Sequence, residues 1–205
     1  MIDYSGKCYV DIEEYVKSEV LVKNNIYFLP SLHGSLEFGI AAQKILDSIQ
    51  FDAVALELPD FMKKSYCEGL ERLPYISAVC VEAAGSLCYH LIEPQDAMSA
   101  AGRAVLKSGR HADVHFVDRF IDDYRPHADA FPDSYSLYGA GLVNYCERYY
   151  SACENMPLNE REHEDLMREQ YMAASLQALS AGHSKILFVC GLYHYPAIFR
   201  MLDYD

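Results

Sequence analysis

The residues Ala53-Val54-Ala55-Leu56-Glu57-Leu58, which are followed by Pro59, decide the fold class of this chain. The run is apolar at every position but one, as is typical of a strand that is buried on both faces of a parallel sheet. Pro59 cannot donate to a sheet ladder, so it ends the run. Because a strand buried on both faces needs helices above and below it, this short run predicts an α/β protein.

Four further apolar runs of similar length predict strands. They cover residues 26–29, 89–92, 114–117 and 186–190. Apolar residues at helical spacing lie between them, over residues 36–49, 97–106 and a longer region, 137–181. Strands that alternate with helices in this way indicate a mainly parallel sheet that is covered on both faces.

The whole chain, residues 1–205, is therefore predicted to form a single α/β domain. Its mainly parallel sheet would have about five or six strands, with helices on both faces and a long helical insertion before the last strand. Residues 120–135 are rich in Asp and Pro, which favours a loop or lid. The segment 120–181 would thus hold this loop or lid and the helical insertion.

Composition narrows the classes of protein and partner. The chain has 51% apolar residues and 23% charged residues, so it can bury a core. Its 17 basic and 30 acidic residues give a net charge of −13, which argues against nucleic-acid and anionic-membrane partners, because both bind a basic face. No stretch approaches the ~18 apolar residues of a membrane span, and no signal-peptide pattern is visible. Seven cysteines without a C-x-x-C pair favour a reducing, cytoplasmic location.

Ionisable residues follow the predicted strands in order along the chain. They are His33, then Glu57 with Asp60 nearby, Glu93 and Asp96, the pair Asp118-Arg119, and His194. In an open parallel sheet the active crevice lies beyond the carboxyl ends of the strands, so we expect these side chains to converge. Imidazole and carboxylate together suit a divalent transition metal ion, which lowers the pKa of a bound water. Each residue alone also fits an ordinary structural role, such as a loop histidine or a surface ion pair.

Glu57 is the residue for which a purely structural role is hardest to accept. It interrupts an otherwise apolar strand, where a carboxylate costs several kcal/mol unless it is paired or bound to a metal. The sequence therefore predicts a partner for Glu57 at the end of its strand.

The order of motifs along the chain resembles the TraB/TIKI family. The family shows a strand ending in G-x-x-H, a strand with an acidic end, a D-R pair, an R-[DE]-x-x-M-A helix and a second G-x-x-H. The corresponding segments here are Pro30-Ser31-Leu32-His33, Ala55-Leu56-Glu57-Leu58, Asp118-Arg119, Arg168-Glu169-Gln170-Tyr171-Met172-Ala173 and Gly191-Leu192-Tyr193-His194. The resemblance spans residues 26 to 200. The TraB/TIKI family lies within a larger superfamily that includes ChaN-like proteins and erythromycin esterases. It departs from the family at Pro30, where the family has glycine.

The resemblance implies a metal-dependent, peptidase-like hydrolase of an amide or ester bond in a peptide or small molecule. Three residues, His33, Glu57 and His194, would be metal ligands or acid–base groups, with Mn, Co, Fe or Zn as the metal. Two cations, Arg119 and Arg168, would orient the substrate or brace the carboxylates. Three more residues, Glu93, Asp118 and Tyr193, would contact the substrate. Whether the chain also binds a protein partner or forms a homo-oligomer stays open.

A second hypothesis comes from the proline in the first motif. Proline cannot adopt the left-handed turn that glycine allows, so Pro30 raises the alternative of a catalytically degenerate module that binds a ligand or partner as a sensor or effector. Haem ligation by the Tyr-rich segment 145–150 is a weaker alternative. The pair His111 and His115 has helical zinc spacing but leads into a predicted strand, where residues four apart are about 13 Å from each other.

Overall fold

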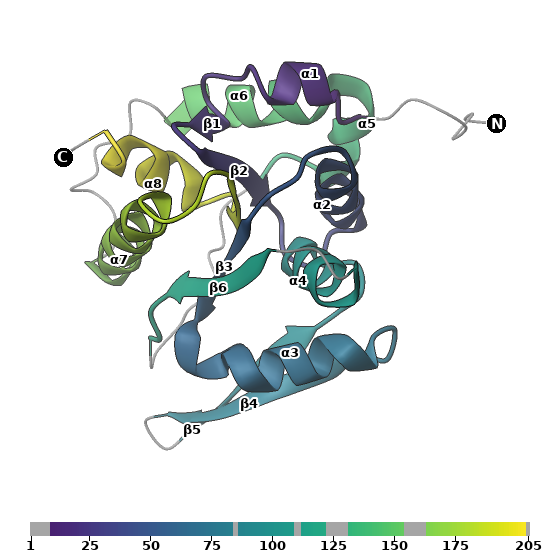
Figure 1. Ribbon diagram of the computed structural model, residues 1–205, viewed down its shortest axis with the longest axis vertical. Coiled ribbons are helices and arrows are strands. Elements are labelled where there is room, and N and C mark those ends of the chain that lie inside the picture. The colour runs from purple at the N-terminus through teal and green to yellow at the C-terminus, as the bar shows by residue number, and fades with distance from the viewer. Residues whose placement is uncertain (1–8, 84–85, 109–111, 122–130, 154–162, 204–205) are drawn as a thin grey trace.

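The centre of the molecule is a five-stranded sheet in the order β1-β2-β7-β3-β6 (Figure 1). The computed structural model describes residues 9–83, 86–108, 112–121, 131–153 and 163–203. Its sheet consists of β1 (Val22–Lys23), β2 (Ile26–Ser31), β7 (Ile186–Gly191), β3 (Ala53–Pro59) and β6 (Asp113–Asp118). All pairs are parallel except β1 with β2, which is antiparallel at one edge. The predicted α/β fold with a mainly parallel sheet is confirmed.

Helices cover both faces of this sheet. The helices are α1 (Ile12–Tyr15), α2 (Leu36–Ser48), α3 (Lys63–Arg72), α4 (Ala97–Ser108), α5 (Leu137–Ala140), α6 (Leu142–Cys153), α7 (His163–Ser180) and α8 (Tyr195–Met201). Figure 1 shows α2 and α4 on one side of the sheet and α7 and α8 on the other. None of the helices within the described ranges is long and apolar enough to cross a membrane.

Aromatic rings fill the core between the sheet and α8. Phe28 of β2 lies 5.5 Å from Phe188 of β7 and 5.2 Å from Phe199 of α8, measured between ring centroids. Tyr195 packs 5.8 Å from Phe28 and donates its hydroxyl proton to the carbonyl oxygen of Val20. Rings at these distances bury a large apolar area and prefer edge-to-face or tilted contacts. They fix α8, and with it the residue that precedes α8, against the end of the sheet.

The register between β3 and β6 shifts near the end of β3. Residues Ala53 to Leu56 pair regularly with β6, but the pairing then shifts before Pro59, which pairs with Asp118. Such irregularities bend a strand and re-aim its side chains, and they are common beside functional sites. Glu57 lies within this irregular stretch, so its carboxylate is directed to the edge of the sheet.

The prediction that residues 89–92 form a strand of the main sheet was wrong. These residues belong to β5 (Ser86–Ile92), which among the described strands pairs with β4 (Ser77–Ala83) alone, in a separate antiparallel hairpin. The two strands alternate between a face toward α3 and a face toward solvent. Because the solvent-facing positions of β5 are also apolar, residues 89–92 form an apolar run with His90 as its one polar member, which resembles the pattern of a strand buried on both faces.

The helical insertion before the last strand is confirmed in the described ranges. Between β6 and β7 lie α5, α6 and α7, together with the short 3₁₀ helix η2 (Ser134–Ser136). Most of the predicted loop or lid, residues 122–130, lies outside the described residues, as does the segment 154–162.

Candidate functional site

A buried arginine lies at the carboxyl edge of the sheet, where β3, β6 and β7 end. Arg168 extends from α7, and its Nη2 donates to Oε1 of Glu57 at 2.8 Å and to Oδ2 of Asp118 at 2.6 Å. Its Nε also donates to Asp118, at 3.1 Å, and its Nη1 donates to Nε2 of His194 at 2.9 Å. One guanidinium therefore joins side chains from three separate parts of the chain.

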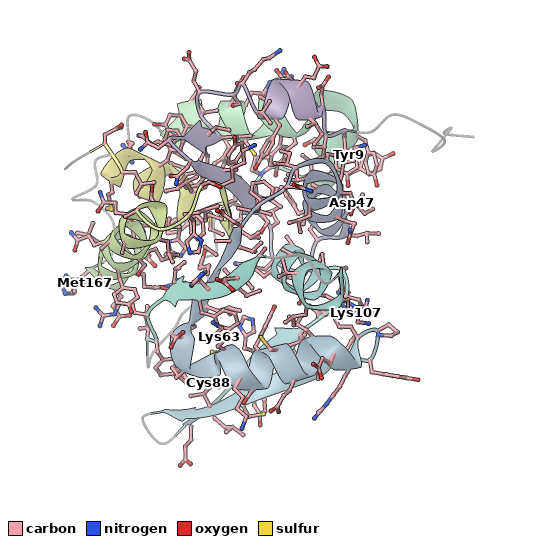
Figure 2. The ribbon with its side chains drawn as sticks, viewed as in Figure 1. Tyr9, Asp47, Lys63, Cys88, Lys107 and Met167 are labelled. Carbon is pink, nitrogen blue, oxygen red and sulfur yellow. The ribbon has the colours of Figure 1, made fainter. Side chains whose placement is uncertain are left out.

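The position of Arg168 follows from the helical periodicity of α7. The buried residues of this helix recur every three or four positions, at Asp165, Arg168, Glu169, Met172, Ala173 and Leu176. This stripe is polar in its first half, which lies beside the sheet edge, and apolar in its second half. Met167, on the opposite side of the helix, points away from the sheet (Figure 2).

Glu57 is the buried carboxylate at the centre of this cluster. Its Oε2 accepts a hydrogen bond from the backbone N–H of Gly191 at 2.6 Å, and its Oε1 accepts the one from Arg168. Burial alone would raise the pKa of Glu57, but the polar groups around it, His194 and Arg168 first, lower this pKa to about 2. The carboxylate is therefore ionised. Arg168 is the partner that the sequence analysis predicted for this buried charge.

Asp118 is the second carboxylate on Arg168, and its electrostatics differ from those of Glu57. It ends β6, and its Oδ1 also accepts the backbone N–H of Arg119 at 2.7 Å. Burial and the charge of Glu57 raise the pKa of Asp118, although Arg168 opposes the shift. Two carboxylates that share one cation are thus pushed apart in pKa, a pattern that recurs in acid–base sites.

His194 is held from both sides of its ring. Because a guanidinium can only donate, Nε2 of His194 accepts the hydrogen bond from Arg168. The other ring nitrogen, Nδ1, then donates to Oε1 of Glu169 at 2.9 Å. Both partners come from α7, so His194 connects that helix to the start of α8.

His33 lies beside this cluster and reaches solvent, since 48% of its side chain is exposed. Its Nδ1 is 3.7 Å from Oδ2 of Asp96, and that same oxygen accepts the N–H of Gly34 at 3.0 Å. Burial would lower the pKa of His33, but the carboxylate of Asp96 and the charge of Glu57 raise it. His33 is therefore an accessible imidazole with a carboxylate behind its ring.

Gly191 allows His33 and Glu57 to approach the end of β7. A Cβ atom at position 191 would lie 3.2 Å from Nε2 of His33 and 3.4 Å from Oε2 of Glu57. Both distances are at or below ordinary contact, and the Glu57 carboxylate cannot move away without losing its hydrogen bonds. The glycine of the second motif thus leaves room for His33 and Glu57, and a larger residue would press against both side chains.

Replacing Gly191 by alanine is expected to lower the free energy of unfolding by about 1–3 kcal/mol, because the added methyl group overpacks the cluster. Urea unfolding followed by circular dichroism measures this loss. The matched control is Gly139→Ala in α5, where an added Cβ meets no atom within 4 Å. Equal stability of the two variants would contradict the packing argument.

A cavity of about 370 Å³ opens over the cluster. Four of its lining residues, His33, Glu57, Asp118 and Arg168, belong to the polar site. The remaining walls come from the segment after β6, from the ends of β3 and η1 (Asp60–Met62), and from the β4–β5 hairpin, and they are mainly apolar. This size and this mixture of walls are typical of a small-molecule site.

The cavity also contains His90, which the sequence analysis did not single out, and the predicted Arg119. His90 of β5 faces the cavity, and burial together with the charge of His33 lowers its pKa. Arg119 lines the cavity with an exposed side chain, and none of the described carboxylates forms an ion pair with it. Its guanidinium is therefore available to a ligand.

The structure brings most of the predicted site residues together. His33, Glu57, Asp118, Arg168 and His194 form or adjoin the cluster, and Arg119 lines the cavity above it. The other two predicted residues lie elsewhere. Glu93 follows β5 and accepts a hydrogen bond from Gln95, while Tyr193 packs its ring against His194; neither lines the cavity.

Two contributors, His90 and Glu169, were missed as site residues, and Asp96 was named as a strand-end carboxylate but given no role. Asp96 is a carboxylate that follows the predicted strand at 89–92. His90 is a polar residue inside that apolar run. Glu169 follows no strand, but it occupies the acidic position of the R-[DE]-x-x-M-A segment and belongs to the buried stripe of α7. The R-[DE]-x-x-M-A motif, which begins at Arg168, is the sequence signal by which Arg168 and Glu169 could have been found together.

Pro30 does not disturb the first motif. The N–H of Phe28 donates to Leu21 on the β1 side, so the nitrogen two residues later also faces that side. The pairing of β1 with β2 covers only residues 22–23 and 26–27, so no described strand pairs with Pro30 on this side. The left-handed backbone of the turn lies instead at Gly34, with φ of 71°.

The three predicted metal ligands do not fit a common metal ion in this arrangement. Nε2 of His194 already accepts a hydrogen bond from Arg168, and the same guanidinium lies on Glu57. A metal ion between these two residues would have to displace the arginine. Among the residues that the structure describes, no group of three or more His, Cys, Asp or Glu side chains is arranged to hold a metal ion.

Fold and site together define an α/β protein with a buried arginine–carboxylate–histidine cluster beneath a small cavity, at the carboxyl edge of a mainly parallel sheet. No family model, no curated protein and no solved structure matches the chain. The resemblance to the TraB/TIKI family therefore stays a hypothesis that rests on the motifs alone.

Proposed function

We propose that this protein hydrolyses an amide or ester bond of a small substrate bound in the cavity, with His33 as the acid–base group. The observation that carries the proposal is the placement of His33, which reaches solvent and the cavity while its ring lies between Asp96 and the end of β7. An imidazole is the group most often used for proton transfer near neutral pH.

In the proposed reaction, neutral His33 takes a proton from a water molecule as the water oxygen attacks the substrate carbonyl carbon. The same proton then passes from His33 to the leaving nitrogen or oxygen as the bond to the carbonyl carbon breaks. Asp96 orients the ring of His33 through Nδ1. The distance between Nδ1 of His33 and Oδ2 of Asp96 is 3.7 Å, and substrate binding would shorten it. Arg119 donates to the carbonyl oxygen as negative charge develops on it.

Arg168 has a different role in this proposal. Its Nε, Nη1 and Nη2 all donate to protein partners, so it acts as a positioning residue and not as a substrate ligand. Its single positive charge lies between Glu57 and Asp118 and reduces the repulsion between these two carboxylates beneath the cavity.

The divalent metal ion predicted from the sequence stays a prediction, and no step above depends on it. Two lines of support concern location and substrate size. The six described cysteines are free thiols, which supports the proposed cytoplasmic location. A cavity of about 370 Å³ supports a small molecule or a short peptide end as substrate.

The test is a hydrolysis assay of the full chain on a panel of chromogenic esters and anilides with short acyl groups. Each substrate is assayed after chelation with EDTA and again with added Mn²⁺, Co²⁺, Fe²⁺ or Zn²⁺. Turnover is expected with at least one substrate and in the chelated protein. Turnover only after metal addition would restore the metal-dependent mechanism, and an absence of turnover across the whole panel would contradict hydrolysis.

A second candidate, a non-catalytic ligand-binding module, is favoured by one observation. Within the cluster, Glu57, Asp118 and His194 are each hydrogen-bonded to Arg168, which leaves His33, His90 and Arg119 as the ionisable groups of the cavity lining that can contact a ligand. Under this alternative, a ligand released unchanged would stabilise the protein against heat without any product being formed. Mass spectrometry of the panel compounds after incubation distinguishes the two outcomes.

A further inference from the structure

We propose that the acyl group of the substrate is an apolar hydrocarbon chain, which lies along the apolar part of the cavity lining. This inference rests on the proposed hydrolysis and names its substrate class, an ester or amide of a medium-chain carboxylic acid. Addition of water across the bond would give that acid and an alcohol or amine.

Most of the cavity lining outside the polar cluster is apolar. We call this part the acyl wall, and its members include Leu58, Met62, Val81, Met98, Phe120 and Ile121. These residues come from both sides of the cavity, since some belong to the edge of the main sheet and Val81 belongs to the β4–β5 hairpin, which Figure 1 shows as a separate layer. A hydrocarbon chain between these two layers would remove apolar surface from water on both sides, which favours binding.

The polar groups of the lining are not available to a polar acyl group. Glu57 and Asp118 already accept hydrogen bonds from Arg168, at 2.8 and 2.6 Å. In the proposed reaction, His33 transfers the proton and Arg119 holds the carbonyl oxygen. A hydroxyl, amide or charged group on the acyl wall would therefore lose water without gaining a hydrogen bond, and binding would be weaker.

The charge of the lining also disfavours an acyl group with a free amine, such as the first residue of a peptide. The ionisable residues of the described lining are two carboxylates, two arginines and two histidines, so the cavity has no net negative charge. Both carboxylates lie on Arg168, and neither is left to pair with an ammonium group. The cavity thus differs from the chain as a whole, whose net charge of −13 would attract cations.

Two methionines and a pair of aromatic rings suit a flexible chain. Met62 and Met98 are 4% and 3% exposed, and their unbranched side chains adapt to ligands of different shape. Phe120 of the acyl wall packs 5.4 Å from Phe61, measured between ring centroids, and Phe61 is 58% exposed. The apolar surface therefore continues beyond the cavity, where a large exposed ring is available to the end of a longer chain.

The test is a series of para-nitrophenyl esters in which the leaving group is constant and the unbranched acyl group grows from acetate to octanoate. The value of kcat/KM is expected to rise about two- to fourfold for each added CH₂ group, as burial of that group predicts. A second pair, leucine para-nitroanilide and isocaproyl para-nitroanilide, differs only in the α-amino group. The isocaproyl compound is expected to be the better substrate.

Val81→Phe fills part of the acyl wall from β4 and is expected to lower the octanoate-to-acetate ratio of kcat/KM by about tenfold, the effect of roughly two buried CH₂ groups. This ratio does not depend on the fraction of the protein that is folded, so a folding defect cannot imitate the result. The matched control is Val22→Phe on β1, where a valine that is also half-buried does not line the cavity. Its ratio should equal that of the wild-type protein.

Three outcomes would overturn the acyl wall while leaving the proposed hydrolysis in place. They are equal kcat/KM at every chain length, an octanoate-to-acetate ratio that Val81→Phe does not change, and faster cleavage of the leucine anilide.

Calorimetric titration with sodium butanoate and sodium octanoate separates the acyl wall from the reaction, because an acid can bind whether or not its ester is cleaved. Octanoate is expected to bind about tenfold more tightly or better, and Val81→Phe should remove this preference. Equal binding of the two acids would contradict the acyl wall. The expected preference without turnover of any ester would contradict the hydrolysis alone.

Discussion

Replacing Arg168 by methionine is expected to lower the free energy of unfolding by about 3–5 kcal/mol, which is a large share of the stability of an ordinary domain. The substitution keeps most of the apolar length of the side chain but removes the charge. Glu57 and Asp118 would then lie buried without their cation, and Nε2 of His194 would lose its donor. Leaving buried charges uncompensated is among the largest single-residue effects known.

Urea unfolding of Arg168→Met measures this loss. The matched control is Arg72→Met at the end of α3, where the arginine is exposed and the expected change is within about 0.5 kcal/mol. Arg168→Lys separates charge from geometry. An ammonium group cannot reproduce the fork that spans Glu57, Asp118 and His194, so this variant should recover only part of the loss. A methionine variant as stable as the wild-type protein would show that the cluster is not the ionic centre described above.

Replacing His33 by glutamine is expected to reduce kcat of the proposed hydrolysis by about 10²–10⁴-fold, the usual contribution of a general acid–base group. Glutamine keeps a polar side chain of similar reach but cannot carry a proton between water and the leaving group. Stability should change little, because about half of the His33 side chain is exposed and the ion pair that the structure gives it, with Asp96, is a long one of 3.7 Å.

Initial rates on the best substrate of the panel, with urea unfolding alongside, test the role of His33. The control is His115→Gln on β6, whose ring packs on His183 and does not line the cavity. Its rate should equal that of the wild-type protein. If His33→Gln retains the wild-type kcat, the acid–base role passes to another group of the cavity, of which His90 is the nearest candidate by type.

The parallel sheet could be predicted from the sequence because its strands are apolar on both faces. Ala53–Pro59 and Ile186–Gly191 are buried at nearly every position, and this burial leaves a continuous apolar run. The same signal misplaced residues 89–92. In that strand, the residues of one face are apolar because they pack against the core, whereas the apolar residues of the other face are exposed to solvent. The sequence alone does not distinguish a buried apolar residue from an exposed one.

The convergence of the site could be predicted in part for a similar reason. Strand ends of a parallel sheet meet at one edge, which is enough to bring Glu57, Asp118 and His194 together. What the strand-end rule could not supply is the cation between them. Arg168 reaches the edge from a helix, and whether a guanidinium or a metal ion neutralises two carboxylates depends on a few ångströms that the order of residues does not specify.

The order of strands in the sheet has a consequence for synthesis of the chain. β7 lies between β2 and β3, yet it is the last of the described strands to leave the ribosome. Until it is made, β2 and β3 have no common neighbour. Glu57 likewise precedes its cation by 111 residues. The N-terminal part of the nascent chain can therefore form helices and the β4–β5 hairpin, but the sheet and the ionic cluster can close only once the final strand inserts between two that are already present.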